Sequence, residues 1–192
     1  HELIVLDISS RERNETFDIS LIKKIKNEIF IPLTIGGGIN DIDQVSEIID
    51  EGVEKVCLNS RLEKDLKLVN EIANKFGSQS VIASIDVKKF NNEYCVFYQN
   101  GKKKSDIELK VYLRDLENAG CGEIILTSID KEGTRSGFDI ELYKHIEDQV
   151  KLPIIAHGGA SDINSFTELF DKTDISSASA GSTFVYFGKR KA

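Results

Sequence analysis

The segment IPLTIGGGINDIDQVSEII, residues 31–49, recurs 121 positions later as LPIIAHGGASDINSFTELF, residues 152–170. Without a gap, residues 2–53 and 123–174 share 16 identities in 52 positions, far more than chance would give. Each copy is typical of a short buried strand, a glycine turn and an amphipathic helix that begins after an aspartate. A repeat unit as long as this offset, 121 residues, would when present twice make roughly 242 residues, close to the roughly 250 of a (β/α)8 barrel.

Strand patterns and helix patterns alternate along the whole chain, which predicts the α/β class with a parallel sheet. The predicted strands are Leu3–Ile8, Ile31–Ile35, Lys55–Leu58, Val81–Ile85, Glu123–Thr127, Pro153–Ala156 and Ile175–Ala180. The predicted helices are Ile19–Glu28, Ile42–Glu51, Leu66–Phe76, Ile107–Ala119, Ile140–Gln149 and Asn164–Phe170. A polar hairpin with an Asn-Gly turn, Glu93–Tyr98 followed by Lys102–Lys104, interrupts this order.

The repeat also predicts what the chain lacks. It pairs the first predicted strand with the fifth, the second with the sixth and the third with the seventh. The partner of the fourth strand, Val81–Ile85, would lie before residue 1. We therefore expect residues 1–192 to form a single incomplete TIM-barrel domain, built from two half-barrel repeats, whose first βα unit and C-terminal end lie outside this chain.

Composition excludes several classes of function. The chain has 25 Lys and Arg against 32 Asp and Glu, a formal net charge of −7, which argues against a nucleic-acid partner. No apolar run approaches the roughly 20 residues that span a membrane. Cys57, Cys95 and Cys121 form no CxxC pair, so we expect neither a disulfide framework nor a metal site, and a cytoplasmic location.

The two glycine turns are the first candidate site. Each follows a strand and precedes a helix, where backbone N–H groups can bind an anion. The alternative is that the glycines only allow tight turns. Two related copies at strand ends predict two phosphate sites, and so a small-molecule substrate with a phosphate at each end. A polar pair after the next strand would complete each site, with a one-residue shift in the repeat. The predicted phosphate-binding residues are Gly37, Gly38, Asn59 and Ser60 in the first site and Gly158, Gly159, Gly181 and Ser182 in the second.

Acidic residues gather at or just beyond the carboxyl ends of the strands: Asp7, Asp86, Asp130 and Glu132. Asp86 is the main catalytic candidate, because it directly follows the apolar run Ile82–Ile85 and a carboxylate there can act as general acid or base. The alternatives are a helix cap or an ion-pair partner of Lys88 or Lys89.

Other polar residues follow the later strands. The hydroxyls of Thr127 and Ser128 would orient substrate or cap backbone. Gly133 lies in a loop, Asp130–Gly137, that can close over a ligand. His157 corresponds to Gly36 in the repeat, so we interpret it as a variable loop residue.

Three charged residues begin strands: Glu2, Lys55 and Glu123. In a barrel they would meet at the amino-terminal face. Composition alone leaves three roles open for them, namely structural ion pairing, a gate and a docking surface.

A set of short segments gives the chain a family resemblance. They are Leu6-Asp7-Ile8, Ile31–Ile39, Leu58-Asn59-Ser60, Phe76–Gln79, Ile85-Asp86, Gly122–Asp130, Gly133-Thr134, Gly137-Phe138-Asp139 and Gly158-Gly159-Ala160. Over essentially its whole length the chain resembles the HisF family, the cyclase subunits of imidazole glycerol phosphate synthase.

The resemblance implies an activity without a cofactor. Members of the family take ammonia from a HisH-like glutaminase subunit and react it with a bisphosphate ribulosyl intermediate of histidine biosynthesis, giving imidazole glycerol phosphate. Asp86 matches one of two catalytic aspartates, and the other would lie upstream of residue 1. Glu2, Lys55 and Glu123 match three members of the charged ring through which ammonia is thought to enter.

The chain departs from the family pattern at three places. Glu132 stands where the cyclases usually have Asp, His157 replaces a small residue, and the ending Ala180–Ala192 is unlike theirs. This ending resembles a HisF-like branch linked to surface-polysaccharide biosynthesis, in which the pair supplies ammonia to a sugar amidotransferase. The alternative function is therefore an ammonia-channelling subunit for such an amidotransferase.

Overall fold

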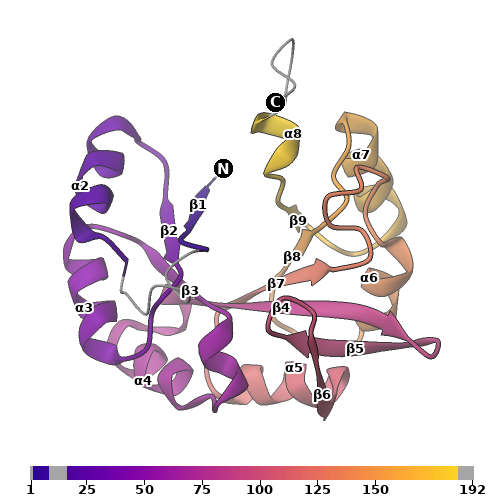
Figure 1. Ribbon diagram of the computed structural model, residues 1–192, viewed down its shortest axis with the longest axis horizontal. Coiled ribbons are helices and arrows are strands. Elements are labelled where there is room, and N and C mark those ends of the chain that lie inside the picture. The colour runs from indigo at the N-terminus through magenta and orange to yellow at the C-terminus, as the bar shows by residue number, and fades with distance from the viewer. Residues whose placement is uncertain (1, 9–16, 186–192) are drawn as a thin grey trace. The chain divides into compact units, whose positions relative to one another are not determined.

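The computed structural model describes residues 2–8 and 17–185, and these form two compact units (Figure 1). The first comprises the described residues up to Ala83 together with Asn118–Gly122, and the second comprises Ser84–Glu117 and the described residues from Glu123 onward. Parallel strands alternate with helices in both units, which confirms the predicted α/β class. Residues 186–192, which include most of the unusual ending, lie outside the described residues.

Strands β1 (Leu3–Leu6), β2 (Leu33–Gly36) and β3 (Lys55–Leu58) of the first unit are parallel neighbours, and β3 pairs in parallel with the start of β4 (Val81–Phe90). Central strand residues such as Leu33, Ile35 and Val56 are fully buried, as expected for parallel strands covered on both faces. The unit's helices are α2 (Ile19–Glu28), α3 (Ile42–Asp50) and α4 (Lys67–Phe76), with short 3-10 helices η1 (Ser60–Glu63) and η2 (Ser78–Ser80).

In the second unit, β4 continues into an antiparallel meander and β7 opens a new parallel run. Figure 1 shows the meander of β4, β5 (Glu93–Tyr98) and β6 (Lys103–Glu108) beside the strands that follow it. The parallel run is β7 (Glu123–Ser128), β8 (Ile154–His157) and β9 (Ser177–Ala178). The helices are α5 (Leu109–Asn118), which ends in the first unit, α6 (Ile140–Ile146), α7 (Ile163–Lys172) and α8 (Ser182–Val185).

The helix starts confirm the aspartate signals in the sequence. Asp18 caps α2 by accepting from Ser20 N at 2.8 Å, and Asp41 and Asp162 cap α3 and α7 in the same way. Asp139 caps α6 by accepting from Leu142 N at 3.2 Å. Each carboxylate satisfies backbone N–H groups that the helix leaves unpaired.

The sequence repeat is also a structural repeat. The bounds of β8 are those of β2 shifted by 121 positions, and α6 and α7 begin 121 positions after α2 and α3. When β1 is shifted by 121 positions it falls within β7, and when β3 is shifted in the same way it includes β9. Helices η1 and α8 begin 122 positions apart, which is the predicted one-residue shift.

The largest difference from the predicted elements lies after Ile85. Strand β4 does not end there but continues to Phe90, because it pairs with β5 through a tight turn at Asn91 and Asn92. Both asparagines have positive φ, 51° and 65°, a conformation that asparagine tolerates better than most residues. The predicted turn at Gln99-Asn100-Gly101 is present, but β6 extends to Glu108 and delays the start of α5.

Two further features bear on function. None of the helices in the described part of the chain is long and apolar enough to cross a membrane. Cys57, Cys95 and Cys121 form no disulfide with one another and are buried, as small apolar residues would be.

Candidate functional site

The two glycine turns have nearly the same backbone. Gly37 and Gly158 have φ of 102° and 97°, a region that favours glycine. A Cβ on Gly37 would overlap the carbonyl oxygen of Asp7, and a Cβ on Gly158 would lie 2.7 Å from that of Ser128. Asp7 and Ser128 are themselves 121 positions apart. The tight-turn alternative therefore explains these glycines without a ligand, and their phosphate-binding role stays a prediction.

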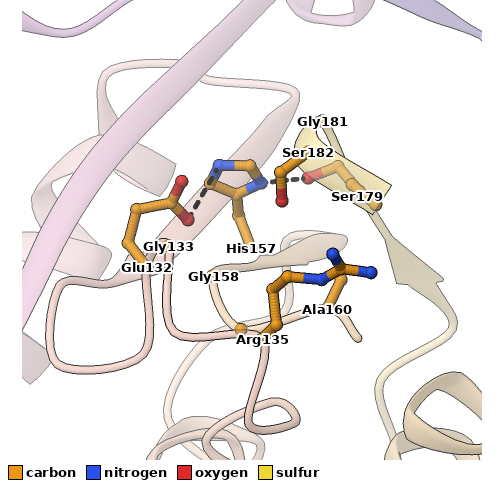
Figure 2. Close-up of a pocket in the computed structure, with 11 residues that line it drawn as sticks. Glu132, Gly133, Arg135, His157, Gly158, Ala160, Ser179, Gly181 and Ser182 are labelled. Carbon is orange, nitrogen blue, oxygen red and sulfur yellow. Dashed lines mark hydrogen bonds and ion pairs between the residues drawn. The ribbon is translucent and has the colours of Figure 1, made fainter. Parts of the chain in front are cut away.

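The second turn lies in a pocket that brings together five predicted residues: Gly133, Gly158, Gly159, Gly181 and Ser182. Figure 2 shows how three elements build this pocket, namely the loop after β7, the turn after β8 and the segment that joins β9 to α8. It is also lined by side chains that the sequence did not point to, among them Arg135 and Ser179. Polar groups from three separate segments thus converge on one turn.

His157 occupies the centre of this pocket, and its interpretation as a variable loop residue is wrong. It is the last residue of β8. Its Nδ1 lies 2.8 Å from Ser179 Oγ and its Nε2 lies 3.5 Å from a carboxylate oxygen of Glu132 (Figure 2). Both ring nitrogens therefore contact side chains, one from the residue that follows β9 and one from the loop after β7.

Tyr143 of α6 hydrogen-bonds to the backbone of His157. Its hydroxyl accepts from His157 N at 3.0 Å and lies 3.0 Å from the carbonyl oxygens of Leu126 and His157. Burial raises the pKa of Tyr143, and the nearby carboxylates of Asp139 and Glu132 raise it further. The phenol consequently stays neutral and fixes the backbone at the end of β8.

The first turn is arranged differently. Gly38 lines a small recess with apolar neighbours such as Phe17 and Ile39, and neither Asn59 nor Ser60 lines it. Asn40 closes the turn by donating from Nδ2 to Gly38 O at 2.8 Å. Arg61 of η1 donates to Asn40 O at 3.4 Å, so η1 does approach this turn. The structure therefore brings the predicted polar residues together at the second turn more fully than at the first.

Asp86 lies within β4, opposite Phe97 of β5, and is half-buried. The helix-cap alternative for Asp86 is wrong, because the strand continues past it to Phe90. The amino group of Lys89 pairs instead with Glu141 at 3.0 Å, and its backbone N donates to Asp130 at 2.9 Å. Thr127 and Ser128 are buried at the end of β7.

Asp139 is a connecting residue that the sequence analysis named only as part of the family segment Gly137-Phe138-Asp139. One oxygen accepts from Ser128 Oγ at 2.9 Å and the other from Tyr94 OH at 3.2 Å. Burial and the Asp139 carboxylate raise the pKa of Tyr94. Asp139 thus connects β7, α6 and the meander. The Ser128 hydroxyl donates to this side chain, whereas the capping alternative expected a backbone partner.

At the other ends of the strands, Glu2 and Lys55 form an ion pair of 2.9 Å. The hydroxyl of Thr34 on β2 also donates to Glu2. The Lys55 and Glu2 side chains are 18% and 23% exposed, so water reaches only part of the pair. Glu123 is the first residue of β7 in the second unit. Structural pairing is therefore present between Glu2 and Lys55.

Comparison with known proteins identifies the family. The sequence profile of the family described as "Histidine biosynthesis protein" matches residues 1–191. A protein of Pseudomonas aeruginosa named "Putative imidazole glycerol phosphate synthase subunit hisF2" is 43% identical over 195 residues, covering 100% of this chain and 76% of that protein.

Two further relatives bear the name imidazole glycerol phosphate synthase subunit HisF. That of Alkaliphilus metalliredigens is 38% identical over 186 residues, covering 96% of this chain and 74% of the relative. That of a Thermotoga species is 41% identical over 169 residues, covering 88% and 67%. The family fold is the (β/α)8 barrel, which is the predicted fold class. The chain belongs to the histidine biosynthesis protein family that includes these HisF subunits.

Proposed function

We propose that this protein is the cyclase subunit of imidazole glycerol phosphate synthase. In this role it takes ammonia from a glutaminase subunit and acts as a carbon–nitrogen lyase on a bisphosphate ribulosyl intermediate of histidine biosynthesis. The observation that carries the proposal is the pair of glycine turns, which recur with one backbone conformation in a chain matched by the family over residues 1–191. The three free, buried thiols are consistent with a cytoplasmic setting.

Each glycine turn takes one phosphoryl group of the substrate in this proposal. Backbone N–H groups at Gly37-Gly38 and Gly158-Gly159 would donate to phosphate oxygens, as they do where a turn opens a helix. At the second turn, Ser182 and Arg135 line the same pocket and would add a hydroxyl and a cationic donor. Thr127 and Gly133 would contact the substrate from β7 and the loop that follows it.

Asp86 is the proposed general acid or base. It is half-buried on β4, whose residues Val81, Ile82 and Ala83 are fully buried. A positioned carboxylate that moves a proton in the transition state contributes roughly 10²–10⁴-fold to a rate. Asp86→Asn in the full-length protein should therefore reduce turnover of the bisphosphate with ammonium by at least about 100-fold, with little change in folding.

Asp106→Asn is the matched control, because Asp106 is an exposed carboxylate on β6 outside the proposed site. It should leave turnover unchanged. Absence of turnover by the folded, full-length wild-type protein would falsify the cyclase proposal.

Ammonia entry and contact with the glutaminase partner are assigned to Glu2, Lys55 and Glu123, each of which lies at or directly before the first residue of a strand. Glu2→Lys would place two cations together and should lower glutamine-driven turnover by the assembled pair, while turnover with free ammonium persists. The double variant Glu2→Lys with Lys55→Glu restores opposite charges and should recover part of the loss. Equal loss of both activities in Glu2→Lys would contradict a role in ammonia delivery.

A second candidate is the ammonia-channelling subunit for a sugar amidotransferase. It is favoured by one observation, that His157 and Glu132 occupy the second glycine turn with side chains rather than leaving it to backbone groups. Complementation of a cyclase-deficient strain decides between the two. Growth without histidine supports the cyclase, whereas no growth despite full expression and assembly with the glutaminase supports the second candidate.

A further inference from the structure

The two nitrogens of the His157 ring face different partners. Nδ1 lies 2.8 Å from Ser179 Oγ, and Nε2 lies 3.5 Å from a carboxylate oxygen of Glu132. In the neutral ring one nitrogen carries a proton and the other a lone pair, whereas in the protonated ring both nitrogens donate. The protonated ring would therefore donate to Ser179 and form an ion pair with Glu132.

Protonation of His157 would change the charge of a small pocket by one unit. Glu132 contributes a negative charge and Arg135 a positive charge, and within the described part of the chain Arg135 makes no ion pair. Lys131, from the same loop, lies beside Gly159. Tyr143 of α6 is the remaining titratable neighbour, and burial keeps its phenol neutral. With a neutral ring the charges lining the pocket cancel, and with a protonated ring the pocket is cationic.

Among the described residues, the first glycine turn has no counterpart of this arrangement. Gly36 stands in the place of His157, and Arg61, a described cation that approaches this turn, is already paired with Asp65 at 3.1 Å. Anion binding at the first turn should therefore depend little on pH between the titration ranges of carboxylates and lysines. The two turns thus provide an internal comparison in one chain.

We propose that His157 is an anion-binding residue of the second glycine turn, and that this pocket takes up one proton when a dianionic phosphoryl or sulfate group binds. The proposal rests on the proposed function, because it assumes that this turn holds one phosphate of the substrate. By thermodynamic linkage, two factors are then equal: the factor by which the bound dianion raises the affinity of the ring for a proton, and the factor by which protonation raises the affinity of the pocket for the dianion. His157 would make the second site selective for the fully ionised phosphate.

The test is an NMR titration of the imidazole ring signals between pH 5 and 8, with and without saturating sodium sulfate at constant ionic strength. Sulfate is the probe because it stays a dianion over this range, so that any pH dependence belongs to the protein. The titration midpoint of His157 should rise by about one pH unit, which corresponds to about tenfold tighter binding to the protonated form. His145 of α6, whose ring packs against Tyr94 of β5, is the internal control, and its titration midpoint should not change with sulfate.

His157→Gln provides the matched variant, because glutamine keeps a hydrogen-bonding group and cannot take up the proton. It should bind sulfate about tenfold more weakly than the wild type at pH 6 and equally well at pH 8. An unchanged His157 midpoint with sulfate bound overturns the proposal and leaves the phosphate site intact. If the Gly158 and Gly159 amide signals do not respond to sulfate at any pH, the anion site itself is wrong, and with it this part of the proposed function.

Discussion

Gly36-Gly37-Gly38 and His157-Gly158-Gly159 occupy equivalent places in the two repeats, yet among the described residues more polar side chains suited to an anion surround the second turn than the first. Gly37 and Gly158 have nearly the same φ, and at these positions the carbonyl oxygens of Asp7 and Ser128 leave no space for a Cβ. The residue before each glycine pair differs, with Gly36 in the first turn and His157 in the second.

The neighbours of that residue explain the difference. A Cβ on Gly36 would lie 2.6 Å from Leu6 Cδ2 and 2.8 Å from Cys57 O, so a side chain does not fit there. The position equivalent to Leu6 is Thr127, which is smaller and has no atom that corresponds to Leu6 Cδ2. The imidazole of His157 contacts Ser179 and Glu132. The repeat therefore sets the backbone of each turn, and the adjacent strands decide whether it carries a functional side chain.

The largest expected effects concern the shared backbone. Gly37→Ala and Gly158→Ala should each lower the free energy of unfolding by about 3 kcal/mol, because the new Cβ meets a carbonyl oxygen at a positive φ. Gly133→Ala is the control, with φ of 73° and no atom within 4 Å of the new Cβ, and should cost about 1 kcal/mol. Urea denaturation measures all three. Equal losses of stability in Gly37→Ala and Gly133→Ala would show that close packing is not the reason for a glycine at position 37.

The next effect tests the position at which the turns differ. Gly36→Ala should cost about 2 kcal/mol, because overpacking against Leu6 and Cys57 forces a local shift. His157→Ala should cost less than about 1 kcal/mol, since its side chain is partly exposed. The same denaturation experiment compares them. A larger loss in His157→Ala would mean that this residue stabilises the fold rather than serving a ligand.

Tyr143→Phe tests a difference between the repeats that lies in α6. The equivalent residue in the first repeat is Ile22, which has no hydroxyl. Removing the Tyr143 hydroxyl leaves His157 N without its acceptor in a buried place, at a cost of about 1.5 kcal/mol. Tyr94→Phe, which removes a hydroxyl that is less buried, should cost about half as much. Thermal unfolding of both variants checks the order.

The smallest effect concerns Glu54, whose equivalent in the second repeat is the buried Ile175. Burial alone would raise the pKa of Glu54, but hydrogen bonds from Leu33 N and Lys26 outweigh it and hold the pKa below its ordinary value of 4.5. Its contribution to stability is therefore present above pH 4.5 and is lost as the pH falls through the lowered pKa.

Glu54→Gln should cost about 0.5 kcal/mol at pH 7, a small value because the side chain is nearly half exposed. The difference in stability between the wild type and the variant should shrink as the pH falls through the lowered pKa of Glu54. A difference that does not change with pH, measured by urea denaturation at several pH values, would contradict the role of the charge.

Much of the fold was predictable from the sequence because its signals are local. The helix starts after Asp18, Asp41 and Asp162, and the strands of the repeat, depend on capping groups and short apolar runs. The extension of β4 was not predicted, because it depends on a pairing partner, β5, and on a turn at Asn91 and Asn92 whose signal is weak.

The candidate site was predictable only in part. The glycine turns and their polar partners appear in the sequence repeat, so the second pocket was expected from Gly158, Gly159, Gly181 and Ser182. The roles of Arg135 and Ser179 could not be predicted, since each is brought to the pocket by a different segment. His157 was misinterpreted because comparison with Gly36 gives its place in the repeat and says nothing about the neighbours that hold its ring.

In the proposed function, the two glycine turns each bind one phosphoryl group of a single bisphosphate substrate. The most direct measurement is an NMR titration of the full-length protein with the bisphosphate substrate in the absence of ammonia, following the backbone amide signals of Gly37, Gly38, Gly158 and Gly159. The signals of both pairs should shift together, with the same dissociation constant, and saturate at one equivalent of ligand. Shifts confined to one pair, or saturation at two equivalents, would contradict it.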